Sequence, residues 1–303
     1  MKKERLSSCL GRVVLWSLLS WPFLSQQTQA ASPYETALAR AMDSMYAIDY
    51  DQASTEFEAA IRLDPGNPRT YLYLATNYWM KTLYSQNTLV STAFGLPPDP
   101  YIAPNGKPCP PDLRKKYEET IGQMKEKAQA RLNANPKDPE ALFWLGMAEG
   151  SESVFIISVD HRLFAAKSHA DKSFELMEAA YALDKSFKDP LFPMGMHMHL
   201  LGTRGLLTRT ILKLMGYKVS KEEGRKFVEI AVSNARYVRD DARLGLVLCD
   251  IREERWHEAI TEMQTVLRNF PKIPCWPLPW GGFRPLKATL QTRLPHSKES
   301  GSV

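Results

Sequence analysis

The chain has 303 residues, a net charge of +5 at pH 7 and 44% hydrophobic residues, which is ample apolar material for a sizeable core. Of that net charge, +3 belongs to the first 30 residues and +2 to all the others. A charge this small, with no basic stripe along the chain, argues against nucleic acid as a partner.

The N-terminus has the pattern of an export signal. Lys2, Lys3 and Arg5 precede the apolar run Val13–Leu24, and small residues at Ala30 mark a cleavage point. Residues 1–30 are therefore expected to be a signal peptide, and the mature protein to lie in the periplasm or envelope. The run is shorter than the roughly 20 residues that span a bilayer. An uncleaved anchor is the alternative.

Residues 50–79 contain two amphipathic helical patterns on either side of an Asp-Pro-Gly-Asn-Pro turn at 64–68. In the first helix Ala53, Phe57 and Ala60 share one face, so that a neighbouring helix can approach closely at the alanines. The second helix repeats large and small apolar residues at helical spacing: Tyr71, Leu74, Ala75 and Tyr78. Two such helices cannot bury these faces alone, and this predicts a stack of similar pairs.

These positions resemble the tetratricopeptide repeat, a 34-residue helix-turn-helix unit, with Pro65 at its closing proline. The resemblance covers residues 34–271 and implies an all-α fold, a right-handed α-solenoid. The expected solenoid, residues 31–271, contains five repeats, at about 34–67, 68–137, 138–187, 188–237 and 238–271. In the third repeat, residues 150–158 are expected to be a long connection, and Phe164, Phe174, Met177 and Ala180 to supply the inward face of the second helix.

Two segments do not fit the repeat. Residues 95–111 contain seven prolines and two glycines, which predicts an inserted loop. Residues 272–303 form a Pro/Trp-rich C-terminal tail that is expected to be irregular and partly disordered. The cysteines near these segments, Cys109 and Cys275, are the pair expected to form a disulfide if one exists. Cys249 lies on an apolar helical face and is interpreted as a small buried hydrophobe.

Residues 190–217 are the most apolar part of the mature chain. Arg204, Arg209 and Lys213 interrupt this segment at helical spacing, which argues against a membrane span. One over-long buried helix, or two short helices broken near residues 202–205, both fit the pattern. A membrane-surface or lipid-associated role for 190–217 is the alternative function.

No catalytic or metal-binding constellation is evident. His197 and His199 point about 200° apart on a helix and cannot chelate one ion together. His161 and His169 share a face without a completing ligand set. The carboxylates of this region, Glu149, Glu152 and Asp160, have no acid/base partner at a recognisable spacing. The chain is therefore expected to be non-catalytic, with no cofactor and no metal. A cryptic hydrolase would require a deep polar pocket.

Stacked repeats bind extended partners on the concave wall formed by the first helix of each pair. Rotation away from the packed positions predicts seven residues on this wall: Arg69, Leu72, Thr76, Trp79, Glu140, Phe143 and Met147. The expected function is a scaffold that binds a protein or peptide there. The alternative is that these residues contact adjacent repeats or are covered by the 95–111 loop. Arg69 and Asn77 do not reproduce the family's carboxylate clamp.

Overall fold

The computed structural model describes residues 32–89 and 107–271, and every regular element in these ranges is an α-helix. Met1–Ser32 forms a separate unit from Pro33–Val303, and the description concerns the second unit. The predicted signal peptide, most of the 95–111 loop, the 272–303 tail and Cys275 lie outside the described residues and stay predictions.

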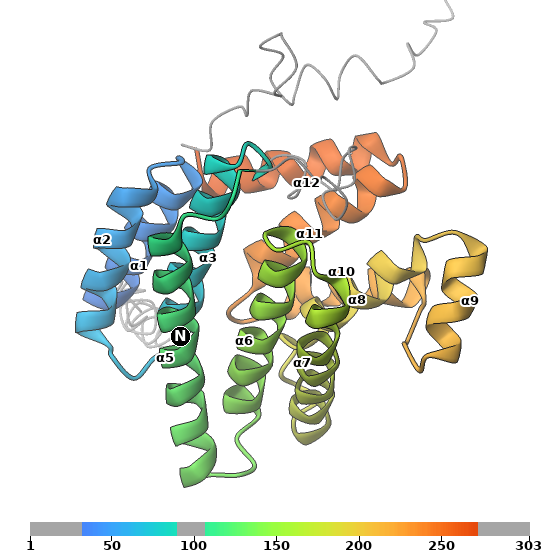
Figure 1. Ribbon diagram of the computed structural model, residues 1–303, viewed down its shortest axis with the longest axis horizontal. Helices are drawn as coiled ribbons and strands as arrows, with labels where there is room; N and C mark the ends of the chain where they lie inside the picture. The colour runs from blue at the N-terminus through green and yellow to red at the C-terminus, as the bar shows by residue number, and fades with distance from the viewer. Residues whose placement is uncertain (1–31, 90–106, 272–303) are drawn as a thin grey trace, which may run out of the picture. The chain divides into compact units, whose positions relative to one another are not determined.

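The helices, shown in Figure 1, are as follows in chain order: α1 (Pro33–Tyr46), α2 (Tyr50–Leu63), α3 (Pro68–Ser85), α5 (Pro111–Ala134), α6 (Pro139–Ser158), α7 (Leu163–Leu183), α8 (Leu191–Gly202), α9 (Leu206–Leu214), α10 (Lys221–Asn234), α11 (Arg239–Arg252) and α12 (Trp256–Asn269). The most extensive contacts join α1 with α2, α3 with α5, α6 with α7, α8 with α10, and α11 with α12. Each pair also contacts the pair that follows it, which is the packing of an α-solenoid. The all-α, tetratricopeptide-like fold is confirmed.

Local sequence explains where the helices begin. The Asn67 side chain accepts the backbone N–H of Arg69 and donates to Asp64, and Pro68 follows at the first helical position of α3. Asp138 caps α6 in the same way, through the backbone N–H of Ala141. A polar cap followed by proline satisfies otherwise unpaired helix N–H groups and fixes the backbone angle of the first turn. These turns fold from local chemistry.

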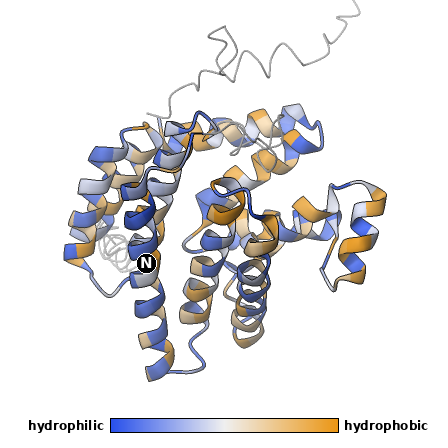
Figure 2. Ribbon diagram, in the orientation of Figure 1, coloured by the Kyte–Doolittle hydropathy of each residue, from blue (hydrophilic) through white to orange (hydrophobic). Residues whose placement is uncertain are grey.

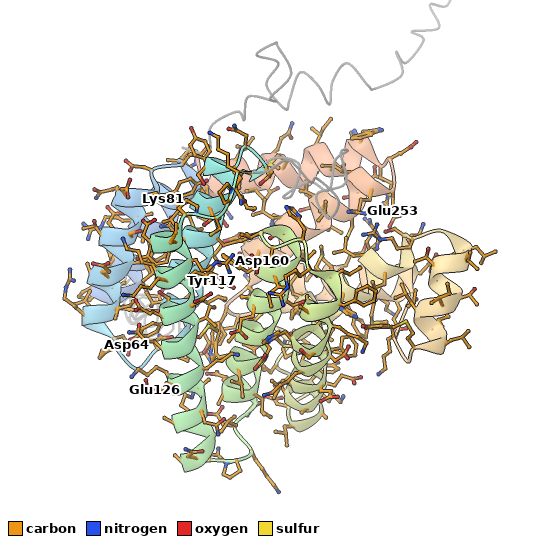
Figure 3. All side chains as sticks on the ribbon, in the orientation of Figure 1. Asp64, Lys81, Tyr117, Glu126, Asp160 and Glu253 are labelled. Atoms are coloured by element: carbon orange, nitrogen blue, oxygen red, sulfur yellow. The ribbon has the colours of Figure 1, made fainter. Side chains whose placement is uncertain are left out.

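The repeat positions expected to be buried are buried. Ala53, Phe57, Ala60 and Ala75 have no exposed surface, and Tyr71, Leu74 and Tyr78 are each at most 6% exposed. Between the second and third pairs, the ring of Tyr117, which is labelled in Figure 3, stacks on that of Phe155 with centroids 4.0 Å apart. The predicted small-and-aromatic pattern is therefore the pattern of the core.

The third pair differs from expectation at its turn. Residues 150–158, expected to be a long connection, are the last part of α6, and α7 begins only at Leu163. Phe164, expected to face inward, is 89% exposed because it lies in the first turn of α7. Met177 and Ala180, further along α7, are buried as expected.

Glycines bring α8 and α10 into close contact. A Cβ on Gly224 would lie 2.5 Å from the backbone nitrogen of His199, and one on Gly202 would lie 2.4 Å from that of Lys221. No side chain fits at these distances, so the two helices pack backbone to backbone. The apolar segment 190–217 is thus two short helices, α8 buried against α10 and α9 beyond it. None of the helices among the described residues is long and apolar enough to span a bilayer.

Candidate functional site

The wall predicted to bind a partner lies on α3 and α6. Arg69 pairs with Glu35 of α1 at 3.2 Å and is half-buried, as are Thr76 and Trp79. The indole N–H of Trp79 donates to the Ser158 hydroxyl at 2.9 Å, which joins the end of α6 to α3. These three side chains remain partly accessible.

Two of the predicted wall residues belong to the core instead. Leu72 is 4% exposed, and Phe143 is fully buried with its ring against those of Trp144 and Phe187. The reason is tertiary: Phe187 of the α7–α8 turn packs on Phe143, and Tyr237 and Val238 of the turn between α10 and α11 belong to the same apolar cluster. Leu72 and Phe143 therefore present no surface to a partner, contrary to the expectation from sequence.

The α10–α11 turn, residues 235–238, is held in place by one buried carboxylate. Asp189 has no exposed surface and accepts the backbone N–H groups of Arg236, Tyr237 and Val238 at 2.9, 2.6 and 3.1 Å. Three hydrogen bonds satisfy this charge and fix three backbone amides at once. The α7–α8 turn, which carries Asp189, thereby determines where the α10–α11 turn lies.

From this position the turn reaches α3 and α6. The Tyr73 hydroxyl donates to the Asp241 carboxylate at 2.8 Å, across 168 residues of sequence. Burial raises the pKa of Asp241 to about 6, although the hydrogen bond from Tyr73 acts in the opposite direction. Glu140 accepts hydrogen bonds from the Tyr237 hydroxyl and from Arg236, at 3.0 and 2.9 Å. Burial and the neighbouring Glu140 raise the pKa of Tyr237 to about 12.

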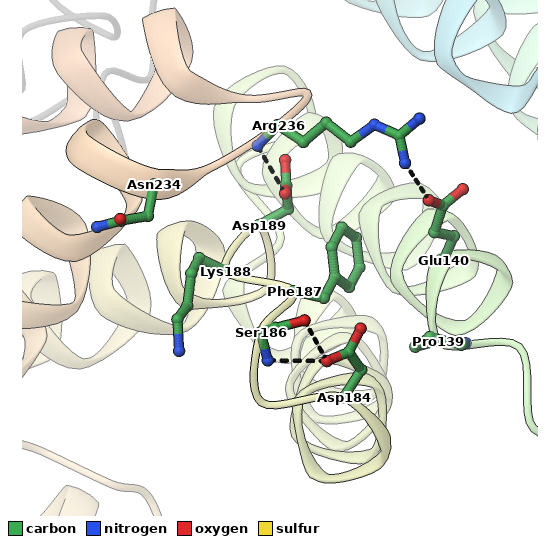
Figure 4. A pocket seen from close by; sticks show the side chains of 9 residues that line it. All are labelled: Pro139, Glu140, Asp184, Ser186, Phe187, Lys188, Asp189, Asn234 and Arg236. Carbon is green, nitrogen blue, oxygen red and sulfur yellow. Dashed lines mark hydrogen bonds and ion pairs between the residues drawn. The ribbon is translucent and has the colours of Figure 1, made fainter.

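A shallow polar pocket of about 230 Å³ opens beside this contact (Figure 4). Its wall comes from α6, from α10 and from the α7–α8 and α10–α11 turns, and it carries both signs of charge: Pro139, Glu140, Asp184, Ser186, Phe187, Lys188, Asp189, Asn234 and Arg236. The Arg236 side chain is 70% exposed at the mouth. Each carboxylate is already engaged, Glu140 by Arg236, Asp189 by backbone amides and Asp184 by Ser186, which leaves no free acid/base pair.

A second polar cluster was not apparent from sequence. Glu149, Glu152 and His169 bring their ligand atoms within 4.8 Å of one another, with Glu149 buried. The ammonium of Lys125 lies 3.0 Å from Glu149 and also contacts Glu152. Burial opposes ionisation of Glu149, but its hydrogen bonds to His169 and Lys125 hold its pKa below the usual value. A lysine thus already supplies the positive charge, and the cluster is an ion network that joins α5, α6 and α7.

The two histidines of α8 lie in different surroundings. The His197 ring packs between Phe174 and Tyr217, and burial lowers its pKa. His199 is fully buried, with Nδ1 3.1 Å from the carbonyl oxygen of Lys221 and Nε2 3.6 Å from Glu253. Both are parts of the packing around α8. Cys249 nearby is buried, which raises its pKa to about 12, in agreement with its interpretation as a hydrophobe.

No protein-family model matches the sequence, and no curated protein matches it. Among solved structures, similarity is found to the crystal structure of a thermophilic TPR protein of Thermus thermophilus, with 14% identity over 79% of this chain and 92% of that chain, and a TM-score of 0.38. PilW, a widely conserved type IV pilus biogenesis factor, has 14% identity over 80% of this chain and 98% of that chain, and a TM-score of 0.26. Likenesses of this strength carry no argument about function.

Proposed function

We propose that the protein is a non-catalytic scaffold of the bacterial envelope that binds a protein or peptide beside the α10–α11 turn. The observation that carries this proposal is the polar pocket at Glu140 and Arg236, where side chains of two successive repeats converge. The envelope location rests on the export pattern of residues 1–30.

The size and chemistry of the pocket favour a peptide side chain as its occupant. Its volume of about 230 Å³ is below the roughly 300–1,000 Å³ typical of small-molecule sites. Lys188 and Arg236 offer donors to a carboxylate or carbonyl, and Asn234 offers an amide for a peptide backbone. Exposed arginine is also common in protein interfaces. A polar, partly acidic segment of a partner would fit this charge pattern.

The partly exposed residues of the predicted wall extend this surface. Arg69, Thr76, Trp79 and Met147 stay half-buried on α3 and α6, and Glu140 lines the pocket itself. An extended partner that occupies the pocket would continue over these side chains. They remain the proposed binding residues, without Leu72 and Phe143.

Photo-crosslinking in cells tests this function. A photoreactive amino acid is placed at Trp79 or at Arg236, both with accessible surface, and products are identified by mass spectrometry. The control position is Glu126, which is exposed on α5 and outside the pocket. One recurrent partner captured from Trp79 and Arg236 but not from Glu126 is the expected result. Crosslinks confined to the chain itself would contradict the proposal.

A charge reversal then sharpens the test. Arg236→Glu places an acidic group at the pocket mouth without disturbing the core, because this side chain is largely exposed. The expected result is a loss of capture from Trp79, since a rim charge affects association with a partner of opposite charge. Lys115→Glu, on α5, exposed and not among the residues that line the pocket, is the matched control and should leave capture unchanged.

A further inference from the structure

Helix α9 has an apolar face that nothing in the described part of the chain covers. No residue of α9 is buried, and its largest apolar side chains are among the most exposed of the described residues. Their exposed fractions are 72% for Leu206, 76% for Leu207, 49% for Ile211 and 83% for Leu214. Figure 1 shows α9 beyond α8, and Figure 2 shows the hydrophobic colouring along it.

An ordinary surface helix buries its apolar face and exposes its polar face, and α9 does the reverse. Leu207, Ile211 and Leu214 follow the i, i+4, i+7 spacing of one helical face, and this face is the exposed one. Arg209 lies on the other side and is half-buried, with its Nε atom shielded from water and without a hydrogen-bond partner. Packing within the described part of the chain does not account for this arrangement.

The C-terminal end of α9 is fixed, so its exposure there is not the result of fraying. Gly216 has a φ of +89°, a backbone conformation that favours glycine, and the backbone N–H of Tyr217 donates to the carbonyl oxygen of Leu212. This is the Schellman arrangement that terminates helices. Next to it, the Lys167 ammonium lies 4.9 Å from the Tyr217 ring centroid, and Lys218 pairs with Glu178 of α7. These contacts attach the residues that follow α9 to α7, while α9 itself remains exposed.

The segment that contains α9 carries positive charge only. No Asp or Glu occurs between residues 190 and 221, whereas Arg204, Arg209, Lys213 and Lys218 lie in this segment. Lys213 is exposed on α9, and no ion pair joins it to another described residue. An apolar face flanked by cations complements a surface with an apolar interior and anionic groups at its boundary.

We propose that α9 docks on an anionic lipid bilayer surface, with Leu207, Ile211 and Leu214 inserted at the headgroup boundary and Lys213 facing lipid phosphates. The nine residues of α9 would extend for roughly 14 Å and lie in the membrane plane, since this length is too short to span. Because α9 makes its main contacts with α8 alone, it can enter a planar surface without displacing the core. This surface is separate from the pocket and adds a site to the scaffold.

Vesicle flotation with the purified full chain tests the proposal. The protein is expected to float with vesicles of phosphatidylcholine and phosphatidylglycerol, and much less with phosphatidylcholine alone. Leu207→Ser combined with Leu214→Ser should reduce the bound fraction on anionic vesicles by about tenfold, because two apolar side chains leave the interface. Lys213→Glu should weaken binding severalfold, and added salt should act in the same direction.

The matched control is Phe164→Ser, which removes an apolar side chain that is equally exposed but lies on α7. All variants keep residues 13–24, so that apolar run cannot account for a difference between them. The proposal is overturned if the wild-type chain ignores anionic vesicles, or if the α9 and Phe164 variants bind alike. A crosslink from position 211 to a single protein in cells, without lipid crosslinks, would assign α9 to a protein partner and also overturn it. None of these results depends on the pocket at Arg236.

Discussion

The wall of α3 and α6 and the face of α9 both carry large apolar residues, but they differ in what covers these side chains. On the wall, the α10–α11 turn supplies Tyr237 and Val238, and Leu72 and Phe143 become core residues. On α9, no described element plays that part, and Leu207 and Leu214 remain exposed. An apolar pattern thus predicts that a helix face will be buried. The tertiary fold decides whether another segment of the same chain buries it.

The largest effect is expected from the carboxylate that closes the wall. Asp189→Ala leaves the amides of Arg236, Tyr237 and Val238 without their buried acceptor. We expect a loss of about 4 kcal/mol in the free energy of unfolding, measured by urea denaturation, since each unpaired buried group costs about 1–3 kcal/mol. Asp189→Asn keeps one accepting oxygen and should lose less. Equal losses in the two variants would contradict this role.

The stability that depends on Asp241, which accepts a hydrogen bond from Tyr73, should also change with pH. The pKa of Asp241 is raised by burial to about 6 from an ordinary value of 3.8. Between pH 7 and pH 4 the folded protein therefore takes up a proton that the unfolded chain does not. This contribution to stability grows as pH falls through about 6 and is lost as pH rises again.

Asp241→Asn removes this titration. The difference in free energy of unfolding between the wild-type protein and this variant should shift in favour of the wild type by about 2 kcal/mol or slightly more between pH 7 and pH 4. Urea denaturation of both proteins across this range measures the difference. Parallel pH profiles would show that Asp241 does not titrate in this window.

A smaller effect on stability is expected where α10 packs against α8, the helix that precedes α9. A Cβ added at Gly224 would meet the backbone of Gly195 and His199 at 2.5–2.9 Å, so Gly224→Ala must separate α8 from α10. We expect a loss of about 2 kcal/mol, typical of overpacking. Gly205→Ala has no atom within 4 Å of the new Cβ and should change stability little. Thermal denaturation distinguishes the two, and similar losses would contradict the close packing.

The smallest effect is expected on α9 itself. Leu207→Ser with Leu214→Ser removes side chains that are 76% and 83% exposed, so the free energy of unfolding should stay within about 0.5 kcal/mol of the wild-type value. A loss of more than about 2 kcal/mol would show that the pair belongs to a core, and α9 would then resemble the wall.

The sequence by itself determined the helix pairs and their starts. Ala53, Phe57 and Ala60 define a buried face through spacing alone, and Asn67-Pro68 and Asp138-Pro139 begin helices through hydrogen bonds within a few residues. Such features are predictable because cap, turn and helical period all act over one or two turns of chain.

Only the tertiary structure decided which faces stay open. The ring of Phe143 is buried against that of Phe187 in the α7–α8 turn, and the contact of Tyr73 with Asp241 spans 168 residues. Glu149 and His169 likewise meet only because α6 and α7 pack together. Helical periodicity identifies the apolar or charged side of each helix but not the segment that will cover it, because that choice follows from how all the pairs stack.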